Sequence, residues 1–315
     1  MTAARDPSRR VPVLVGPTAS GKTSVSLLIA AQLGAEIISA DSRQVFRCMD
    51  IGTAKPSLAD RARVHHHFVD TLNPGEEFNA GEYGVRGREL IGKLFLRGKV
   101  PLVVGGSGLY VRALVDGFFE GVVPADPELR SGLSDRLRDE GAQTLLEELR
   151  KIDPAAASRM LPSNTRRIIR ALEVYKLTGT PISELQKSRA AIPFVPVFAG
   201  LQWNRKELYA RINRRVDSMI ANGLVEEVKA LIAAGSPFGA NALKTTGYQE
   251  VFAYLAGELT LDEMVPLIKR NSRRYAKRQL TWFRRDERIR WFEVAREEDL
   301  PLVAGRIASF FSEGA

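Results

Sequence analysis

The chain has 315 residues, of which 44% are hydrophobic and 26% charged, a composition typical of a globular protein large enough for more than one domain. Forty-six Lys and Arg residues against 37 Asp and Glu residues leave a formal net charge of +9, which indicates a polyanionic partner. The single cysteine, Cys48, excludes an internal disulfide and a cysteine-rich zinc site, and no apolar run is long enough to span a membrane, so we expect a cytoplasmic protein without membrane contact.

A phosphate-binding loop follows the first predicted strand, at residues 11–15. Residues 16–23 read G-P-T-A-S-G-K-T, a full match to the pattern G-x-x-x-x-G-K-[ST], and a helix predicted over 23–33 ends at Gly34. Backbone N–H groups, the helix N-terminus and Lys22 are expected to bind phosphate, and Thr23 to hold Mg²⁺. The predicted phosphate-binding residues are Gly16, Pro17, Thr18, Ala19, Ser20, Gly21, Lys22 and Thr23.

Strand and helix signals then alternate. A strand is predicted at 36–40, a helix at 79–98 and another strand at 100–104, which is followed by G-G-S-G and a helix that begins at Leu109. This alternation predicts an α/β fold in which helices flank a parallel sheet of the P-loop NTPase type. Ligands of such sheets bind beyond the carboxyl ends of the strands, where the loop that starts at Asp41 and the glycine-rich turn would join the phosphate loop.

From residue 119 to residue 194 the pattern is helical throughout. Asp126-Pro127, Asp153-Pro154 and Thr180-Pro181 mark helix starts, so we predict an all-helical insertion domain. Strand signals return at 195–201 and 289–294, and a terminal helix follows. The predicted domains are therefore a P-loop core over 1–118 and 195–315, with basic C-terminal helices, and the helical insertion over 119–194.

A long basic helix is predicted near the end of the chain. No acidic residue lies between Glu263 and Asp286, whereas the same stretch holds eight Lys and Arg residues. A solvated face is one interpretation; beside a phosphate loop, nucleic acid is the favoured partner, and Trp282 and Phe283 are candidates for stacking on bases. The predicted buried side holds Met264, Ile268, Tyr275 and Trp282.

Other polar groups allow more than one interpretation. Asp41 follows a strand directly, so it can serve as a general base, as a metal ligand or as a helix N-cap. The arginines of 164–170 can form a clamp over an anionic ligand or a solvated helix face. For the three histidines at 65–67 we expect packing or hydrogen bonding rather than metal binding, because consecutive residues cannot all face one ion.

Six ordered motifs together resemble one family. They are the phosphate loop, I-I-S-A-D-S-R-Q-V-F running to D-I-G-T-A-K-P, V-G-G-S-G-L-Y, N-T-R-R-I-I-R-A-L-E-V, T-T-G-Y-Q-E and Y-A-K-R-Q-L-T-W-F-R. The chain resembles, over nearly its whole length, the bacterial tRNA dimethylallyltransferases, which prenylate the adenosine 3′ of the anticodon. Phe46, Cys48 and Ser107 depart from the Tyr, Gly and Thr usual in the family.

The resemblance implies a monomeric, Mg²⁺-dependent enzyme that binds dimethylallyl diphosphate and a tRNA anticodon stem-loop. It assigns the base that deprotonates the target amine to Asp41, the diphosphate to the phosphate loop, and a further diphosphate contact to Arg215. The residues that it implies for tRNA binding are Asp41, Ser42, Arg43, Gln44, Ser107, Arg166, Arg167, Ile168, Ile169, Arg170, Thr245, Thr246, Gly247, Tyr248, Gln249, Glu250, Lys277, Arg278, Gln279, Leu280, Thr281, Trp282, Phe283 and Arg284.

Two alternatives remain open at this point. A small-molecule or nucleotide kinase would share the phosphate loop, Asp41 and an arginine-bearing helical lid, but it would leave the basic helix unexplained. The strand at 100–104 also ends in Gly-Gly rather than in the Asp expected to organise Mg²⁺ in a nucleoside triphosphatase. A non-catalytic RNA-binding protein with ATP as a structural ligand is the second alternative, and it predicts no loss of function on Asp41→Ala.

Overall fold

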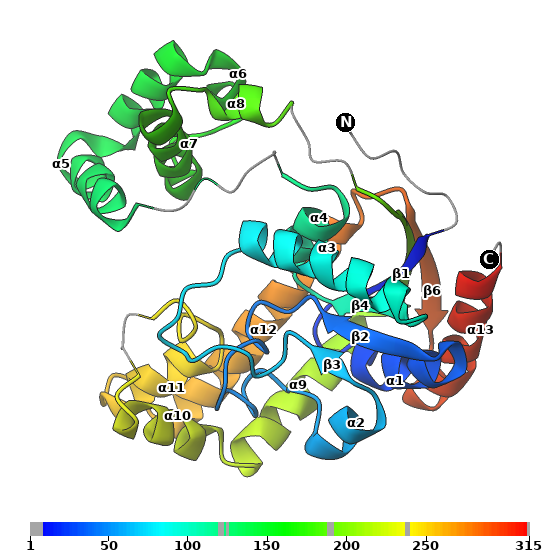
Figure 1. The fold of residues 1–315 in the computed structure, drawn as a ribbon. Coiled ribbons are helices and arrows are strands. Elements are labelled where there is room, and N and C mark those ends of the chain that lie inside the picture. The colour runs from blue at the N-terminus through cyan, green and yellow to red at the C-terminus, as the bar shows by residue number, and fades with distance from the viewer. Residues whose placement is uncertain (1–8, 119–122, 124–125, 188–191, 237–239, 314–315) are drawn as a thin grey trace. The chain divides into compact units, whose positions relative to one another are not determined.

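The computed structural model describes residues 9–118, 123, 126–187, 192–236 and 240–313. The chain divides into two compact units. One contains residues 116–192 and the other contains residues 4–115 and 193–315, and each is described by itself (Figure 1).

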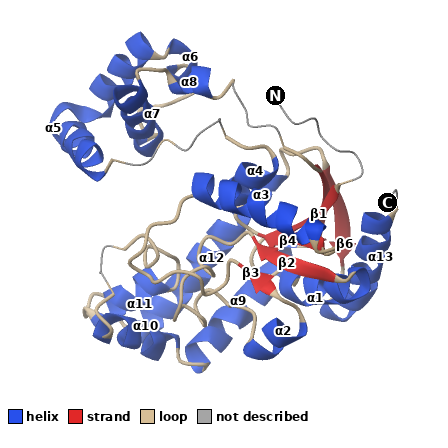
Figure 2. Ribbon diagram, viewed as in Figure 1, coloured by secondary structure: helices blue, strands red, loops and turns tan. Residues whose placement is uncertain are grey.

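A single six-stranded parallel sheet forms the centre of the larger unit (Figure 2). The strand order is β3-β2-β4-β1-β5-β6. Strands β1 and β4 therefore pair directly at the centre of the sheet. This arrangement confirms the predicted α/β class with a parallel sheet flanked by helices. The strands are β1 (Arg10–Val15), β2 (Ala35–Ser39), β3 (His66–His67), β4 (Val100–Gly105), β5 (Val195–Trp203) and β6 (Ile289–Val294).

Helices of the larger unit pack in pairs: α1 against α13, α3 against α4, and α9 against α12 (Figure 1). Local signals set their ends, since Gly34 closes α1 in the left-handed conformation and the Asn79 side chain accepts a hydrogen bond from Glu82 N at 3.0 Å to start α3. The helices are α1 (Lys22–Leu33), α2 (Leu58–Arg63), α3 (Ala80–Leu96), α4 (Gly108–Val115), α9 (Arg205–Ala221), α10 (Leu224–Ala233), α11 (Tyr248–Leu255), α12 (Leu261–Phe283) and α13 (Leu300–Ser312).

The core of this unit explains why its strands are nearly continuous apolar runs. Leu14, Ile37, Leu102 and Leu201, from four different strands, are at most 2% exposed, because helices cover both faces of a parallel sheet. The single edge strand that sequence patterns missed is β3, which has only two residues, both histidines, and forms by pairing with β2. Among the described residues, none of the helices is long and apolar enough to cross a membrane.

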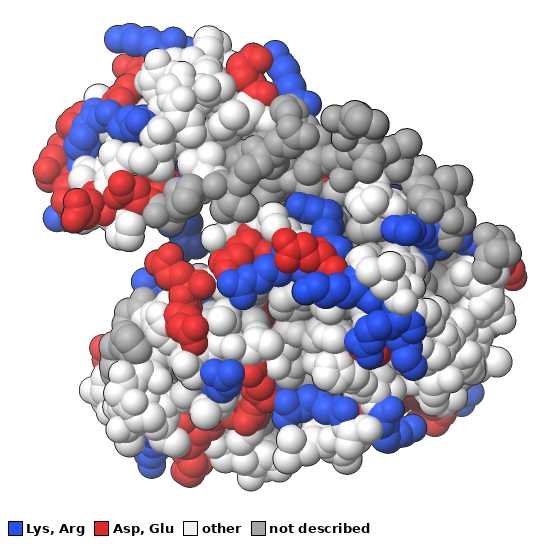
Figure 3. All heavy atoms as spheres, in the orientation of Figure 1, with Lys and Arg blue, Asp and Glu red and all other residues white. Residues whose placement is uncertain are grey.

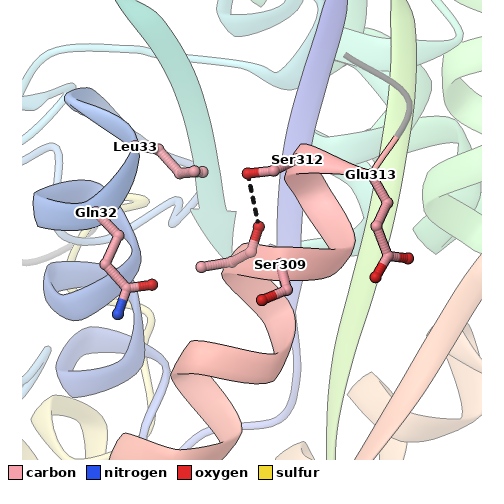
Figure 4. Close-up of a pocket in the computed structure, with 6 residues that line it drawn as sticks. Gln32, Leu33, Ser309, Ser312 and Glu313 are labelled. Carbon is pink, nitrogen blue, oxygen red and sulfur yellow. Dashed lines mark hydrogen bonds between the residues drawn. The ribbon is translucent and has the colours of Figure 1, made fainter.

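A cavity of about 400 Å³ lies between the C-terminal ends of α1 and α13, lined by Gln32 and Leu33 on one helix and by Ser309, Ser312 and Glu313 on the other (Figure 4). The phosphate loop precedes α1 and therefore lies at the other end of that helix. The Ser312 hydroxyl donates a hydrogen bond to Ala308 O at 3.1 Å, within its own helix. The cavity is thus separate from the site described below.

The smaller unit is helical throughout its described residues and has its own core. Asp126 and Asp153 cap α5 and α6 through their side chains, as the Asp-Pro pairs predict, and Pro181 precedes the first residue of α8. Gly141 adopts φ 83° and ψ 161° and breaks α5 into two helical segments. Leu133, Leu145, Leu149, Ile168 and Leu172 fill the core. The helices are α5 (Pro127–Ile152), α6 (Pro154–Ala157), α7 (Thr165–Thr178) and α8 (Ile182–Leu185).

Candidate functional site

The phosphate loop connects β1 to α1 and contains two residues in the left-handed conformation. Ala19 and Gly21 have positive φ angles, 61° and 87°, and Gly21 is the N-cap of α1. A Cβ at Gly21 would lie 2.9 Å from the Leu300 side chain, so glycine is required here for both conformation and space. The first N–H groups of α1 have no partner within the helix and carry partial positive charge, which suits an anion.

Lys22 folds back over this loop. Its ammonium group donates hydrogen bonds to Gly16 O at 2.9 Å and to Pro17 O at 2.8 Å, which places the charge inside the loop. The pKa of Lys22 is lowered to about 8, chiefly by burial; the Asp41 carboxylate opposes this effect and the Arg215 guanidinium adds to it. Lys22, Asp41 and Arg215 are therefore close enough to interact electrostatically, although they come from three different segments of the chain.

Side chains from distant elements hold the loop from behind. Trp203, at the end of β5, donates from its indole N–H to Ser20 O at 2.9 Å, and Arg211 on α9 donates to Ala19 O at 2.9 Å. The Arg211 guanidinium also lies 4.4 Å from the centre of the Trp203 ring, a cation–π distance. Ser20 Oγ is buried and has no hydrogen-bond partner among the described residues, so the loop retains an unpaired polar group.

Gln279 of α12 ties the phosphate loop to the glycine-rich turn. Its carbonyl accepts a hydrogen bond from Thr18 N at 2.9 Å, and its amide donates to Gly106 O at 2.8 Å. A Cβ at Gly106 would lie 2.4 Å from the Gln279 amide nitrogen, so the turn needs a glycine there. The sequence assigned Gln279 to tRNA binding; its side chain is buried and its polar groups are used inside the protein.

Asp41 lies two residues beyond the end of β2, and its carboxylate interacts with Lys22 of the phosphate loop. Its Oδ1 accepts hydrogen bonds from Arg43 N at 2.9 Å and from Gln44 N at 3.4 Å, the local bonds of a capping residue. Its Oδ2 has no hydrogen-bond partner among the described residues, so one carboxylate oxygen is available for a ligand. The capping and ligand-facing interpretations of Asp41 are therefore compatible, because each uses a different oxygen atom.

An aromatic cluster includes two tyrosines, Tyr83 and Tyr110, that are close enough to Asp41 to interact with it electrostatically. Tyr83 and Tyr110 stack with ring centres 4.6 Å apart, and Phe68 and Phe78 pack edge-on against Tyr83. Burial raises the pKa of Tyr83 well above its usual value, with further contributions from Tyr110 and the Asp41 carboxylate. The Tyr83 hydroxyl has no hydrogen-bond partner within the described part of the chain. This aromatic cluster was not identified from the sequence.

The segment after Asp41 is held against the loop at 53–54. The Gln44 side-chain amide donates to Thr53 O at 3.3 Å and to Ala54 O at 3.2 Å, and Arg215 donates to Thr53 O at 3.4 Å. Arg43 donates to Asn241 O at 2.5 Å, and burial lowers its pKa while Asp41 opposes that effect. The side-chain amide of Gln44, a residue predicted to bind tRNA, is therefore already used within the protein.

Glu227 of α10 fixes the start of the same loop. One carboxylate oxygen accepts from Asp50 N at 2.8 Å and Ile51 N at 2.7 Å, and the other accepts from Gly52 N at 3.1 Å and the Tyr248 hydroxyl at 2.6 Å. Burial and the neighbouring Glu227 carboxylate raise the pKa of Tyr248, which therefore stays protonated as a donor. Sequence reasoning missed Glu227, which lies outside the six motifs and carries no local signal.

Most of the T-T-G-Y-Q-E motif supports this arrangement from inside the protein. Tyr248 and Glu250 are buried, and Glu250 accepts hydrogen bonds from Gly247 N and from Asn271 Nδ2, both at 2.7 Å. Gln249 is exposed, whereas Thr245 donates from its hydroxyl to Ala242 O at 3.0 Å. Thr246 is half-buried. In the glycine-rich turn, Ser107 N donates a hydrogen bond to Ala40 O at 3.1 Å, which connects this turn to the residue before Asp41.

Some of the cations on the basic helix α12 are already paired with residues of α9. Lys269 pairs with Asp217 at 2.5 Å, and Arg273 donates to Asn213 Oδ1 at 2.6 Å, both on α9. On the face of the larger unit visible in Figure 3, Lys and Arg side chains are interspersed with Asp and Glu rather than joined in one patch. The exposed cations of this region are Arg270, Arg274, Lys277, Arg278, Arg284 and Arg285.

Two predictions about the faces of α12 were wrong. Tyr275 and Trp282 are 38% and 37% exposed, although the periodicity placed them on the buried side with Met264 and Ile268, which are buried. Phe283 is only 2% exposed and cannot stack on a base. Trp282 instead lies over the glycine-rich turn, where a Cβ at Gly108 would lie 2.2 Å from its ring. Leu280 is half-buried and Thr281 is exposed.

In the smaller unit, the predicted clamp residues of α7 divide into two groups. Arg166 and Arg167 are exposed, whereas Ile168 lies in the helical core and Ile169 packs against it. Arg170 donates to the buried Glu173 carboxylate at 2.7 Å and to Val123 O at 2.8 Å, so it is used within this unit.

Comparison with known proteins identifies the family. A family model described as IPP transferase matches residues 44–286, and one described as isopentenyl transferase matches residues 9–73. The tRNA dimethylallyltransferase of Pelotomaculum thermopropionicum is 46% identical over 300 residues, which cover 94% of each protein. The chain belongs to the tRNA dimethylallyltransferase family. The resemblance drawn from the six motifs is confirmed.

Other relatives of the family agree. The tRNA dimethylallyltransferase of Desulforudis audaxviator is 48% identical over 283 residues, which cover 90% of this chain and 91% of that protein. The structure resembles the full-length tRNA isopentenylpyrophosphate transferase of Bacillus halodurans, with a TM-score of 0.71, 41% identity and 97% of each chain covered. It also resembles a eukaryotic dimethylallyltransferase acting on tRNA, with a TM-score of 0.82, 26% identity, and coverage of 97% of this chain and 80% of that one.

Proposed function

We propose that the protein transfers the dimethylallyl group of dimethylallyl diphosphate to the exocyclic 6-amino group of the adenosine 3′-adjacent to the anticodon of tRNA and releases diphosphate. Membership of the tRNA dimethylallyltransferase family supports the reaction. The observation that carries it in the structure is the placement of Asp41, with one free carboxylate oxygen, beside the Lys22 ammonium inside the phosphate loop. A general base and a leaving-group site are thereby adjacent.

The diphosphate would bind the phosphate loop from Gly16 to Thr23. Backbone N–H groups at the start of α1, the unpaired Ser20 hydroxyl and the Lys22 ammonium provide its donors. Arg215, which interacts with both Lys22 and Asp41, is placed to contribute further positive charge. These groups stabilise the departing diphosphate as negative charge develops on it when the allylic C–O bond breaks.

Magnesium fits the oxygen donors of this site. Thr23 Oγ1, in the first turn of α1, has no hydrogen-bond partner within the described part of the protein, so a hard oxygen ligand remains free beside the loop proposed to bind the phosphates. When bound, Mg²⁺ would neutralise charge on the diphosphate. Thr23 is the residue that would hold it, which leaves Asp41 Oδ2 free to act as the base.

Asp41 would also accept the proton of the attacking amine. The lone pair of that amine is delocalised into the adenine ring, so removing its proton during attack lowers the barrier, an effect of typically ~10²–10⁴-fold. The aromatic cluster around Tyr83 and Tyr110 lies next to Asp41. Its apolar faces would keep water away from the positive charge that develops on the allyl group.

The tRNA anticodon stem-loop is proposed to contact the exposed cations of α12, together with Arg43, Ser42 and Ser107 near the site and Arg166 and Arg167 of α7. The target adenosine must leave its stack, at a cost of roughly a few kcal/mol that is smaller in a loop than in a duplex. We propose that the protein acts as a monomer in the cytoplasm.

The test is mass spectrometry of adenosines from anticodon stem-loops incubated with the protein, Mg²⁺ and dimethylallyl diphosphate. The expected result is one dimethylallyl group on the adenosine after the anticodon and an equal amount of released diphosphate. Unmodified adenosine, with stoichiometric ADP release when ATP and an acceptor are supplied instead, would support the kinase alternative and refute the proposal.

A further inference from the structure

Two histidines and a glutamate converge on the outer edge of the sheet, away from the residues assigned to catalysis. Glu36 lies on β2, and His65 and His67 lie on the adjacent edge segment that ends in β3. One ligand atom from each of the three residues lies within 4.8 Å of the others. We propose that Glu36, His65 and His67 form a binding site for a divalent transition metal ion of the Zn²⁺ class.

The sheet geometry explains why these three side chains share a face. In the parallel pair β2–β3, Ile37 is opposite His66 and Ile38 is opposite His67, so Glu36 is opposite His65. Side chains alternate between the two faces of a strand, which puts Glu36, His65 and His67 on one face and His66 on the other. Three consecutive histidines cannot share an ion, but the first and third can do so when a neighbouring strand supplies a carboxylate.

The distances allow coordination after a small adjustment. His67 Nε2 lies 2.7 Å from Glu36 Oε2, joined by a hydrogen bond, and the rings of His65 and His67 lie 4.3 Å apart at 71°. Two ligand atoms on a tetrahedral zinc ion lie about 3.3 Å apart, given metal–ligand distances of about 2.0–2.1 Å. The ion would replace the shared proton, and the exposed His65 side chain can rotate to bring its nitrogen closer.

Each of the three groups is chemically suited to the ion. Imidazole and carboxylate are common zinc ligands, and three protein ligands leave a position for water. Arg97 pairs with the other carboxylate oxygen, Oε1, at 2.8 Å, so Oε2 can bind the ion without breaking this pair. The Arg97 side chain is 58% exposed, and its positive charge would oppose an incoming cation.

A bound ion would link β3 to β2. The two-residue strand β3 has little pairing of its own, and an ion held by residues of both segments would keep this edge in register. An ion that binds only the folded chain raises thermal stability in proportion to the logarithm of its concentration. The proposal concerns an edge of the sheet and does not depend on prenyl transfer.

The chain offers unusually clean conditions for a test, because it has only three histidines and one cysteine. Zinc is titrated calorimetrically into untagged, chelator-treated protein in excess Mg²⁺, in a Cys48→Ser background that removes the exposed thiol. We expect one equivalent of zinc to bind and the melting temperature to rise. His65→Ala should weaken zinc binding at least ~10-fold, because losing a ligand costs at least as much as losing an outer-shell partner.

Two further variants separate a metal site from a merely structural cluster. His66→Ala is the matched control, since His66 faces the opposite side of the sheet and should leave zinc affinity within about twofold. Arg97→Gln should tighten zinc binding by removing an opposing charge. The proposal is overturned if the parent protein binds no zinc, or if His65→Ala and His66→Ala weaken binding equally. Tryptophan fluorescence of each variant reports whether it is folded.

Discussion

Glu227 accepts four hydrogen bonds, and replacing it by glutamine tests whether the loop at 50–52 depends on them. Its two carboxylate oxygens serve Asp50 N, Ile51 N, Gly52 N and the Tyr248 hydroxyl at 2.6–3.1 Å. Glutamine has nearly the same shape, so Glu227→Gln leaves no cavity. The substitution removes the charge and turns one acceptor into a donor.

The expected loss follows from the partners of each oxygen. If the glutamine carbonyl keeps Asp50 N and Ile51 N, its amide group faces Gly52 N–H and the Tyr248 hydroxyl. The hydroxyl can rotate and accept from the amide, but Gly52 N–H loses its partner, at a cost of about 1–3 kcal/mol. The retained bonds lose a charged acceptor and weaken by roughly 0.5–1 kcal/mol each. Together these changes lower the free energy of unfolding by about 3 kcal/mol.

Tryptophan fluorescence during urea unfolding measures this loss in the unit concerned. All three tryptophans, Trp203, Trp282 and Trp291, belong to the larger unit, so the smaller unit does not contribute to their signal. With a denaturant slope of about 3 kcal/mol per M, the midpoint should fall by ~1 M urea. Glu226→Gln is the matched control, because Glu226 is exposed on the same helix. Equal midpoints for the two variants would refute the reasoning.

Three other outcomes are expected. Asp41→Asn should lower turnover by ~10²–10⁴-fold while tRNA binding, measured by filter retention, stays within about twofold; unchanged turnover would refute base catalysis. The Lys22 side chain binds diphosphate in its protonated form, and burial lowers its pKa to about 8. The value of kcat/KM for the donor should therefore fall tenfold per pH unit above about pH 8. Lys22→Arg should abolish this fall, because arginine stays protonated in that range. Combined Lys277→Ala and Arg278→Ala substitutions should reduce the salt dependence of tRNA affinity, with the slope of log affinity against log salt falling by about 2, whereas an unchanged slope would exclude these cations from the interface.

The elements that the sequence predicts well are those defined by short-range patterns. The strand before the phosphate loop is β1, the helix that ends at Gly34 is α1, and the Asp-Pro pairs start helices in the smaller unit. Each signal lies within a few residues of the feature that it specifies, as with the Asn79 cap of α3. The convergence of three loops beyond the sheet follows from the same patterns, since parallel strands place their carboxyl ends at one edge.

Helix α12 shows where a periodic pattern fails. Ile268, Tyr275 and Trp282 are seven residues apart, and an ideal helix returns to within ~20° of the same direction at each step, so the period predicts that all three share the buried face of Met264. The buried positions beyond Ile268 are instead Ala276, Gln279 and Phe283, on an adjacent face of the helix, so the buried face changes along a helix that packs against α9, α11 and α4 in turn. Gln279 is a polar residue and does not contribute to an apolar pattern, although it is among the most buried positions of the helix.

The parts of the site that the sequence could not provide are the polar contacts that hold its loops in place. Gln279 reaches the phosphate loop across 261 residues of sequence, and Glu227 reaches the loop at 50–52 across 175–177 residues. Such contacts have no local signature, because glutamine or glutamate on a helix usually faces solvent. They form only when the sheet has brought the loops together. The motifs therefore contain the groups proposed to perform the chemistry, whereas residues outside them or assigned to another role fix the positions of those groups.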